Sequence, residues 1–214
     1  MILCVTGPMA AGKNLAAAIL EKKGFTGIDA DTVAHEAVDA CRDTILSEFS
    51  SIAAEKNIQL ETSDQKIDRR ALASIVFSDP ALLKKQENIV YPYITRYIEE
   101  FIALNNGRDI VLHATVLYKI PDLLKKMDKI LFIDAPRVIR FIRARKRDGL
   151  STRHILQRFA SQRNLFAKYK ALNADIVRVW NIGSGKSLEK KIEKFLYTSR
   201  PGIKEWNRKE HCGF

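Results

Sequence analysis

Residues 1–14 read MILCVTGPMAAGKN, an apolar run followed by a loop between two glycines and then a lysine. The run Ile2–Thr6 predicts a buried β-strand, and apolar residues at helical spacing predict a helix from Lys13 to about Lys23. The pattern Gly7-x-x-x-x-Gly12-Lys13 is most of a Walker A loop, and it lies between this strand and this helix. The stretch therefore predicts an α/β fold with a phosphate-binding site at its first strand–helix junction.

The chemistry of the loop suits phosphate because its backbone N–H groups and the helix N-terminus wrap the anion while the lysine reaches the outer phosphates. Asn14 stands where the motif usually has Ser or Thr, whose hydroxyl ligates Mg²⁺. An amide oxygen can also ligate Mg²⁺, although from a longer side chain. The alternative is an ordinary turn that contains glycines.

The rest of the chain alternates short apolar runs with helical patterns, which predicts a parallel sheet covered by helices. The further predicted strands are Phe25–Asp29, Asp109–Ala114, Lys129–Asp134 and Ile176–Val179. Residues 32–105 are almost entirely helical in pattern, so they predict a helical insertion between the early and middle strands.

Helix boundaries are marked by capping residues. Asp79-Pro80 predicts the start of a helix that reaches Leu104, with Pro92 kinking or dividing it. Pro136 opens a helix to about Arg147, Gly149 breaks it, and Ser151 is expected to cap the next helix, which ends at about Gln162.

Two acids, Asp29 and Asp31, lie at the C-terminal end of the second predicted strand, the edge where α/β sheets bind ligands. An acid there can orient a hydroxyl, accept its proton, or bind Mg²⁺ through water. The alternative for Asp31 is that it caps the helix over Thr32–Val38, and the two roles are compatible.

Positive charge is concentrated in two segments. The chain carries a formal net charge of +11, and residues 119–147 hold ten Lys and Arg against three acids, while residues 186–214 hold eight against four. Within the first segment Arg140, Arg143 and Arg147 share a helix face and suit bidentate phosphate contacts. The field suits a nucleic acid or a small molecule with several phosphates, and solvated or salt-bridged helix faces are the alternative.

The composition excludes several classes of protein. With 46% hydrophobic and 29% charged residues the chain is not a disordered one, and no apolar run approaches the roughly 18 residues of a membrane span. The three cysteines are far apart without a CxxC pair, which argues against a disulfide framework or a zinc site. The N-terminus has no basic leader and only a short apolar stretch, so we expect no secretory signal and a cytoplasmic protein without a membrane partner.

Four blocks in order resemble dephospho-coenzyme A kinase. The most specific is IDRRALASIVFSDP at residues 67–80, followed by ENIVYPYI at residues 87–94. Asp29-Ala30-Asp31 with His35 is similar to a second block. Arg147–Ser151 with Ala160-Ser161-Gln162 is similar to the arginine-bearing lid, and Asn181-x-Gly183 to the adenine-side loop.

The resemblance implies a P-loop kinase-type parallel sheet flanked by helices, with a helical acceptor-binding insert and a helical lid. It also implies ATP-dependent phosphorylation of the ribose 3′-hydroxyl of dephospho-CoA, the last step of coenzyme A biosynthesis, with Mg²⁺. The core would be residues 1–31 and 108–198, with the lid at about 140–163, the insert at 32–107 and a basic extension at 199–214.

The site residues follow from matching these blocks. The resemblance assigns catalysis to Asp31, Lys13, Arg143 and Arg147 and places Mg²⁺ weakly at Asn14 and Asp31. The expected ATP-binding residues are Gly7, Pro8, Met9, Ala10, Ala11, Gly12, Lys13, Asn14, Leu15, Asn181 and Gly183. The expected acceptor-binding residues are Asp29, Asp31, His35, Arg69, Arg70 and Tyr91.

Three positions depart from the family pattern. Asn14 replaces the metal-binding hydroxyl, Tyr91 stands where the family usually has His, and the Pro-Leu-Leu-x-Glu segment reads Thr115-Val-Leu-Tyr-Lys119, so an acid has become a lysine. Two alternatives follow: a diverged nucleoside or nucleotide kinase, and a catalytically silent relative that binds nucleotide or, through its basic tail Thr198–Phe214, RNA.

Overall fold

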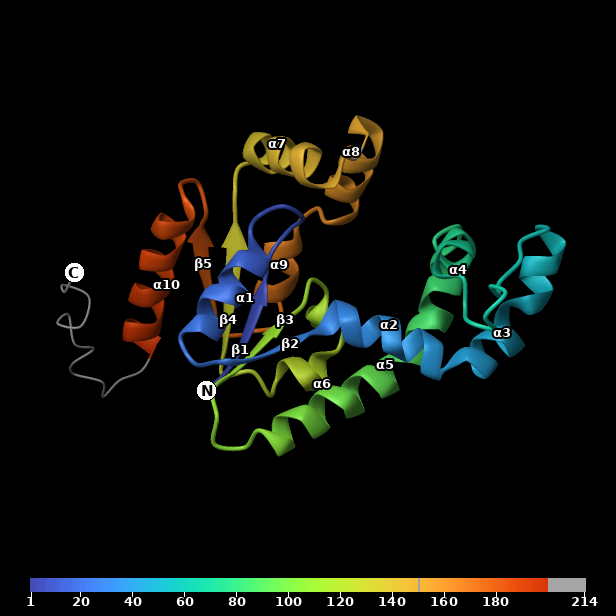
Figure 1. The fold of residues 1–214 in the computed structure, drawn as a ribbon, viewed down its shortest axis with the longest axis horizontal. Coiled ribbons are helices and arrows are strands. Elements are labelled where there is room, and N and C mark those ends of the chain that lie inside the picture. The colour runs from blue at the N-terminus through green and yellow to red at the C-terminus, as the bar shows by residue number, and fades with distance from the viewer. Residues whose placement is uncertain (150, 200–214) are drawn as a thin grey trace.

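The computed structural model describes residues 1–149 and 151–199. Its centre is a parallel sheet of five strands in the order β2-β3-β1-β4-β5. Because every paired strand runs in the same direction, all carboxyl ends meet at one edge, which faces the helices α7 and α8 in Figure 1. The strands are β1 Ile2–Thr6, β2 Thr26–Asp29, β3 Ile110–His113, β4 Lys129–Asp134 and β5 Ile176–Trp180.

Helices cover both faces of the sheet, as predicted. On one face α1 (Lys13–Lys22) and α10 (Gly185–Ser199) pack on Leu3 and Val5, whereas Cys4 between them contributes to the core of the other face. This alternation follows from the period of two in a strand. Short elements complete the second face: η1 Leu117–Lys119, α6 Pro121–Leu124 and α9 Leu165–Lys170.

Four helices lie between β2 and β3, which confirms the predicted helical insertion. They are α2 Ala30–Ala40, α3 Arg42–Glu55, α4 Arg69–Val76 and α5 Pro80–Leu104. Figure 1 shows that α3 and α4 extend away from the sheet, beyond α2. Asp79 caps α5 and accepts the Ala81 N–H at 2.7 Å, as expected. Of the two effects predicted for Pro92, a division does not occur, because α5 continues through it, and a kink stays a prediction.

The lid follows β4. It consists of α7 (Arg137–Asp148) and α8 (Thr152–Ser161), separated by Gly149, whose φ of 60° ends α7 in the left-handed region. The Ser151 hydroxyl accepts the His154 N–H at 3.4 Å and so caps α8. Both boundaries confirm the prediction from the sequence.

No helix within residues 1–149 and 151–199 is long and apolar enough to cross a membrane. The expected basic extension lies, apart from the end of α10, outside the described residues.

Candidate active site

The loop between β1 and α1 is fixed by its neighbours. Gly7 has a φ of 146°, and a Cβ there would lie 2.0 Å from the Ile133 carbonyl oxygen of β4. Gly12 has a φ of 108°, and a Cβ there would lie 2.3 Å from Asn181 Nδ2. Ala10 is also left-handed, with a φ of 60°, which costs about 1 kcal/mol for a residue with a Cβ. The backbone is therefore held in the shape that the motif predicts.

Asn181, predicted on the adenine side, supports this loop. It is 4% exposed, its Nδ2 donates to the Ala11 carbonyl at 2.8 Å, and its backbone N–H donates to the Asp134 carbonyl at 2.7 Å. The turn after β5 thus positions the phosphate loop. Gly183, two residues later, is exposed. A contact of adenine with Asn181 or Gly183 stays a prediction.

Lys13 is the centre of the polar site. Its ammonium donates a hydrogen bond to the Thr115 hydroxyl at the end of β3. Burial lowers the pKa of Lys13, the carboxylates of Asp31 and Asp29 raise it, and Arg147 of the lid lowers it. Both predicted acids and one predicted lid arginine therefore act electrostatically on Lys13, whose hydrogen-bond partner is Thr115.

The two acids differ in their contacts. The Asp29 carboxylate accepts the Asp31 N–H at 2.9 Å and caps α2, and its Oδ1 lies 3.6 Å from His113 Nδ1. The prediction that Asp31 caps this helix is therefore wrong, because the helix begins two residues earlier than expected. The exposed side chain of Asp31 lies in the first turn of α2, and the helix N-terminus favours its negative charge.

The three arginines of α7 separate by environment. Arg140 is 8% exposed, its Nε donates to the Ala135 carbonyl at 3.0 Å, and its guanidinium stacks 4.5 Å from the Phe159 ring centre. Arg143 has a buried Nη1 without a hydrogen-bond partner among the described residues. An orphaned guanidinium nitrogen favours an anionic ligand. Arg140 is thus part of the lid's packing, whereas the predicted contact of Arg143 and Arg147 with phosphate stays a prediction, supported at Arg143 by the unpaired Nη1.

The lid also contacts the phosphate loop directly. The side-chain Oε1 of Gln162, the residue that ends α8, accepts the Met9 backbone N–H at 2.6 Å. Met9 packs in a small apolar cluster with Ala144 of α7 and Ile155 of α8. The sequence placed Gln162 in the lid block but assigned it no role, because a contact between residues 153 positions apart leaves no local signal.

The predicted acceptor residues of the insert are spread along it. His35 is exposed on α2, one turn after Asp31, so the two share a helix face. Arg69 and Arg70 begin α4, with Arg69 Nη1 3.9 Å from Asp39 Oδ2. Figure 1 shows α4 well separated from α1 and the lid. The structure therefore does not bring Arg69 and Arg70 to the phosphate loop.

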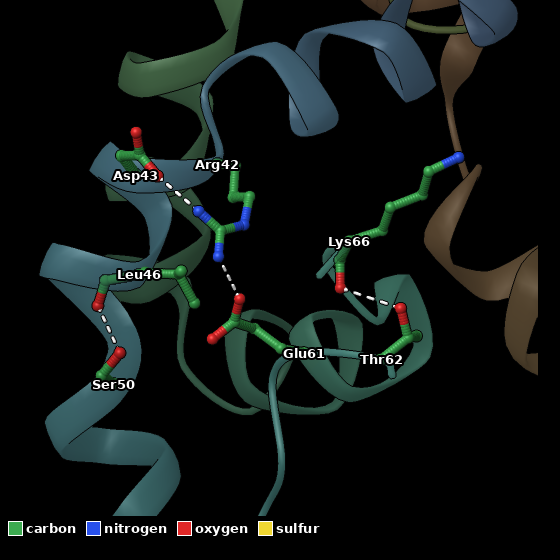
Figure 2. Close-up of polar contacts among 7 residues, drawn as sticks. All are labelled: Arg42, Asp43, Leu46, Ser50, Glu61, Thr62 and Lys66. Atoms are coloured by element: carbon green, nitrogen blue, oxygen red, sulfur yellow. Dashed lines mark hydrogen bonds and ion pairs between the residues drawn. The ribbon is translucent and has the colours of Figure 1, made fainter. Parts of the chain in front are cut away.

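Figure 2 shows how the outer part of the insert is held. Arg42 Nη1 donates to Asp43 Oδ1 at 2.7 Å, and its Nη2 pairs with Glu61 in the segment that precedes α4. The Thr62 hydroxyl donates to the Lys66 carbonyl at 3.3 Å, while the Lys66 side chain points away from this network. These contacts tie α3 to the segment that leads into α4.

Comparison with known proteins decides the family. The sequence model for dephospho-CoA kinase matches residues 1–181. The chain belongs to the dephospho-CoA kinase family. A dephospho-CoA kinase of Treponema denticola is 39% identical over 196 residues, covering 90% of this chain and 87% of its own. That of Treponema pallidum is 34% identical over 205 residues, covering 94% and 96%.

Solved structures agree with this assignment. The dephospho-CoA kinase of Campylobacter jejuni matches with a TM-score of 0.60 at 25% identity, covering 92% of this chain and 96% of its own. A shikimate kinase of Acinetobacter baumannii matches with a TM-score of 0.50 at 14% identity, covering 93% and 94%, and shows the fold alone. The fold is thus that of P-loop kinases, as predicted.

Two residues that depart from the dephospho-CoA kinase pattern, Lys119 and Tyr91, interact with the same side chain. Glu87 of α5 is 9% exposed and forms an ion pair with Lys119 after β3. Burial raises the pKa of Tyr91, and the charge and hydrogen bond of Glu87 raise it further. The lysine that replaces an acid and the tyrosine that replaces a histidine are therefore both partners of one buried carboxylate between the insert and the sheet.

Proposed function

We propose that this dephospho-CoA kinase transfers the γ-phosphoryl group of ATP to the ribose 3′-hydroxyl of dephospho-CoA, giving coenzyme A and ADP. The observation that carries the proposal is Lys13 at the end of the loop between β1 and α1, with its pKa raised by Asp31 and lowered by Arg147, in a chain that belongs to this family. A lysine, an acid and a lid arginine are what phosphoryl transfer needs for positioning and for charge neutralisation.

The donor site is built on the phosphate loop. The loop Gly7–Leu15 and the N-terminus of α1 would wrap the phosphates of ATP through backbone N–H groups that are not bonded within the protein, and Lys13 would reach the outer two phosphates. The ammonium has three donors and gives one to Thr115, so two remain for phosphate oxygens. Asn181 and Gly183 would bound the adenine side.

The acceptor is expected against the insert. We place the catalytic core at residues 1–31 and 108–198 and the acceptor-binding insert at residues 32–107, with Asp29, His35, Arg69, Arg70 and Tyr91 as its contacts. Asp31 would orient the ribose hydroxyl and accept its proton late, because bond formation to the nucleophile lags in a loose transition state. Its exposure at the end of β2 leaves it accessible to that hydroxyl.

Arg143 and Arg147 would neutralise the phosphates from the lid. The orphaned Nη1 of Arg143 supports this role, because a phosphate oxygen would satisfy a donor that the described protein leaves unpaired. Closure of the lid over the phosphates would also exclude water, which competes with the acceptor hydroxyl.

The family implies a divalent metal with ATP, and the residues present fit Mg²⁺. The carboxylate of Asp31, which acts electrostatically on Lys13, and the amide oxygen of the exposed Asn14 are hard oxygen donors. Mg²⁺ takes one or two such ligands and completes its shell with waters and phosphates. When bound, the ion would supply positive charge to the phosphates of ATP.

The test is a product analysis. Purified protein is incubated with Mg²⁺ and ATP and, in separate tubes, with dephospho-CoA, AMP, CMP or water, and the products are identified by mass spectrometry. We expect a phosphoryl group on dephospho-CoA alone. Transfer to AMP or CMP would change the substrate, and the absence of transfer in every tube, with ATP still bound, would refute the proposal in favour of a binding protein.

A further inference from the structure

A chain of hydrogen bonds through the buried hydroxyls of Thr6 and Tyr169 and through the half-buried Thr115 leads to Lys13. The Thr6 hydroxyl at the end of β1 donates to the Tyr169 hydroxyl at 3.1 Å, and Tyr169 donates to the Thr115 carbonyl at 3.2 Å. The Thr115 hydroxyl then accepts the Lys13 ammonium. Thr6 and Tyr169 are both 0% exposed, so solvent does not compete for these bonds. Thr6, Tyr169 and Thr115, which lie in different parts of the sequence, thus form one connected path to Lys13.

Thr115 is the position that makes the path possible. It begins the segment that departs from the family's Pro-Leu-Leu-x-Glu pattern, and proline has no hydroxyl to offer a lysine. The ammonium of Lys13 is partly removed from water, and burial lowers its pKa. An acceptor at this place compensates part of that desolvation and fixes the direction of a side chain with four rotatable carbons.

Tyr169 connects this acceptor to the lid. It belongs to α9, which follows α8 after three residues, and its ring packs edge-on against Tyr118 at 5.5 Å and Phe132 at 6.4 Å between centres. Burial raises the pKa of Tyr169, so its hydroxyl stays protonated and remains a donor to the Thr115 carbonyl. The ring is held by packing and the hydroxyl by two bonds, which makes its position specific.

We propose that Thr115 and Tyr169 are positioning residues for Lys13: Thr115 holds the ammonium toward the phosphates, and Tyr169 holds Thr115. The proposal rests on the proposed function, in which Lys13 contacts the outer phosphates of ATP. Tyr169 acts only through Thr115, so its contribution depends on the Thr115 hydroxyl. The path also joins the segment that follows the lid to the phosphate loop.

The first test is a matched pair of substitutions. Thr115→Val keeps the shape of the side chain and removes the hydroxyl, whereas Thr115→Ser keeps the hydroxyl. We expect Thr115→Val to lower kcat for dephospho-CoA phosphorylation about tenfold, equivalent to one lost charged hydrogen bond, with KM for dephospho-CoA unchanged. Thr115→Ser should restore kcat to within about twofold of wild type. Equal kcat values for the two variants would overturn the role of the hydroxyl.

The dependence of Tyr169 on Thr115 is tested with a double-mutant cycle. Tyr169→Phe keeps the ring packing, and we expect it to lower kcat about threefold to tenfold in the wild-type background. In the Thr115→Val background it should lower kcat by less than about twofold, because the hydroxyl that it positions is already absent. Additive effects of the two substitutions on kcat would overturn the proposal that Tyr169 acts through Thr115. Tyr197→Phe, on the exposed face of α10, is the control for loss of a tyrosine hydroxyl.

A readout without turnover separates this proposal from the proposed function. NMR of ¹³C-labelled lysine, with Lys13→Met to assign the signal, measures the pKa of Lys13 in the substrate-free protein. The hydrogen bond favours the charged ammonium, so Thr115→Val should lower this pKa and Thr115→Ser should not. The other groups that act on Lys13, namely Asp31, Asp29, Cys4 and Arg147, are unchanged in both variants.

The outcomes are therefore distinguishable. If wild type fails to phosphorylate dephospho-CoA while the Lys13 pKa shifts as expected, the proposed function fails and the contact stands. If wild type is active but the pKa and kcat are the same in Thr115→Val and Thr115→Ser, the positioning role fails and the function stands.

Discussion

The Asp29 carboxylate caps α2, while Asp31, two residues later, leaves its carboxylate exposed at the carboxyl edge of the sheet. The two acids of this block therefore differ in their structural roles. One stabilises the start of the insert, and the other is available to an acceptor hydroxyl. The local sequence Asp29-Ala30-Asp31 does not show which acid is the cap, because an aspartate at either position can accept an N–H from the first turn of a helix that follows it.

Substitution of the two acids should separate their effects. We expect Asp31→Asn to lower kcat about 10²–10⁴-fold, the range for loss of a general base, with the Kd for ATP changed less than about threefold. Asp29→Ala should lower the free energy of unfolding by about 1 kcal/mol, because it removes the cap of α2. Steady-state kinetics, calorimetric ATP binding and urea unfolding measure these effects. A turnover unchanged by Asp31→Asn would remove this residue from the mechanism.

At the scale of elements, α5 is joined to the segment after β3 by the Glu87–Lys119 ion pair. The side chains are 12% and 29% exposed, so solvent screens this pair less than a surface pair. Lys119 replaces a family acid and Tyr91 replaces a family histidine. Both replacements interact with Glu87, so the contact between the insert and the segment after β3 uses residues that fit one another.

A double-mutant cycle measures this contact. With Glu87→Gln and Lys119→Met we expect a coupling free energy of about 1–2 kcal/mol in urea unfolding. The control pair is Asp122–Lys125, whose side chains are 85% and 75% exposed, and its coupling should stay below about 0.5 kcal/mol. Equal coupling in the two pairs would contradict the structural role given to Glu87.

The lid and the phosphate loop are joined by Gln162, which accepts the Met9 N–H at 2.6 Å. Gln162→Glu would place a negative charge at this N–H, so we expect the Kd for ATP to rise about tenfold or more through repulsion of the phosphates. Gln162→Ala should change it less than about threefold. Gln157→Glu adds the same charge on the exposed surface of α8 and is the matched control. Calorimetry would contradict the prediction if both charged variants bound ATP equally.

In the molecule as a whole, positive charge is concentrated on α7 of the predicted lid. This helix, Arg137–Asp148, holds six basic residues against one acid within a chain of net charge +11. Such a field attracts ATP and dephospho-CoA, and salt weakens it for exposed charges. We therefore expect the position of these charges, more than the net charge of the chain, to determine the KM for ATP.

Two single substitutions with the same charge change test this point. Lys146→Glu is on α7 of the lid and Lys194→Glu is on α10, and both side chains are exposed. We expect Lys146→Glu to raise the KM for ATP severalfold and to flatten its dependence on KCl between about 50 and 500 mM, and Lys194→Glu to do neither. Identical salt profiles for the two variants would show that only the net charge acts.

Much of the fold could be predicted from the sequence because its signals are local. The apolar runs that became β1 and β4, the glycines of the phosphate loop and the caps Asp79 and Ser151 each act within a few residues. The sequence left open whether Pro92 kinks or divides its helix, because the effect of a proline depends on the packing around it. In the structure α5 is buried along Val90, Ile94 and Ile98 and is not divided.

Local sequence features specify the strand–loop–helix at the phosphate-loop motif, the alternation of strands with helices, and the placement of Asp29 and Asp31 where the second strand gives way to a helix, since these depend on backbone conformation and periodicity. The choice of Asp29 as the cap of α2 depends on where that helix begins. Tertiary structure decided that Lys13 meets Thr115 and that Gln162 and Asn181 hold the loop from the lid and from the turn after β5. These three contacts join residues 102 to 170 positions apart, and only the packing of the sheet with its helices brings them within hydrogen-bonding distance.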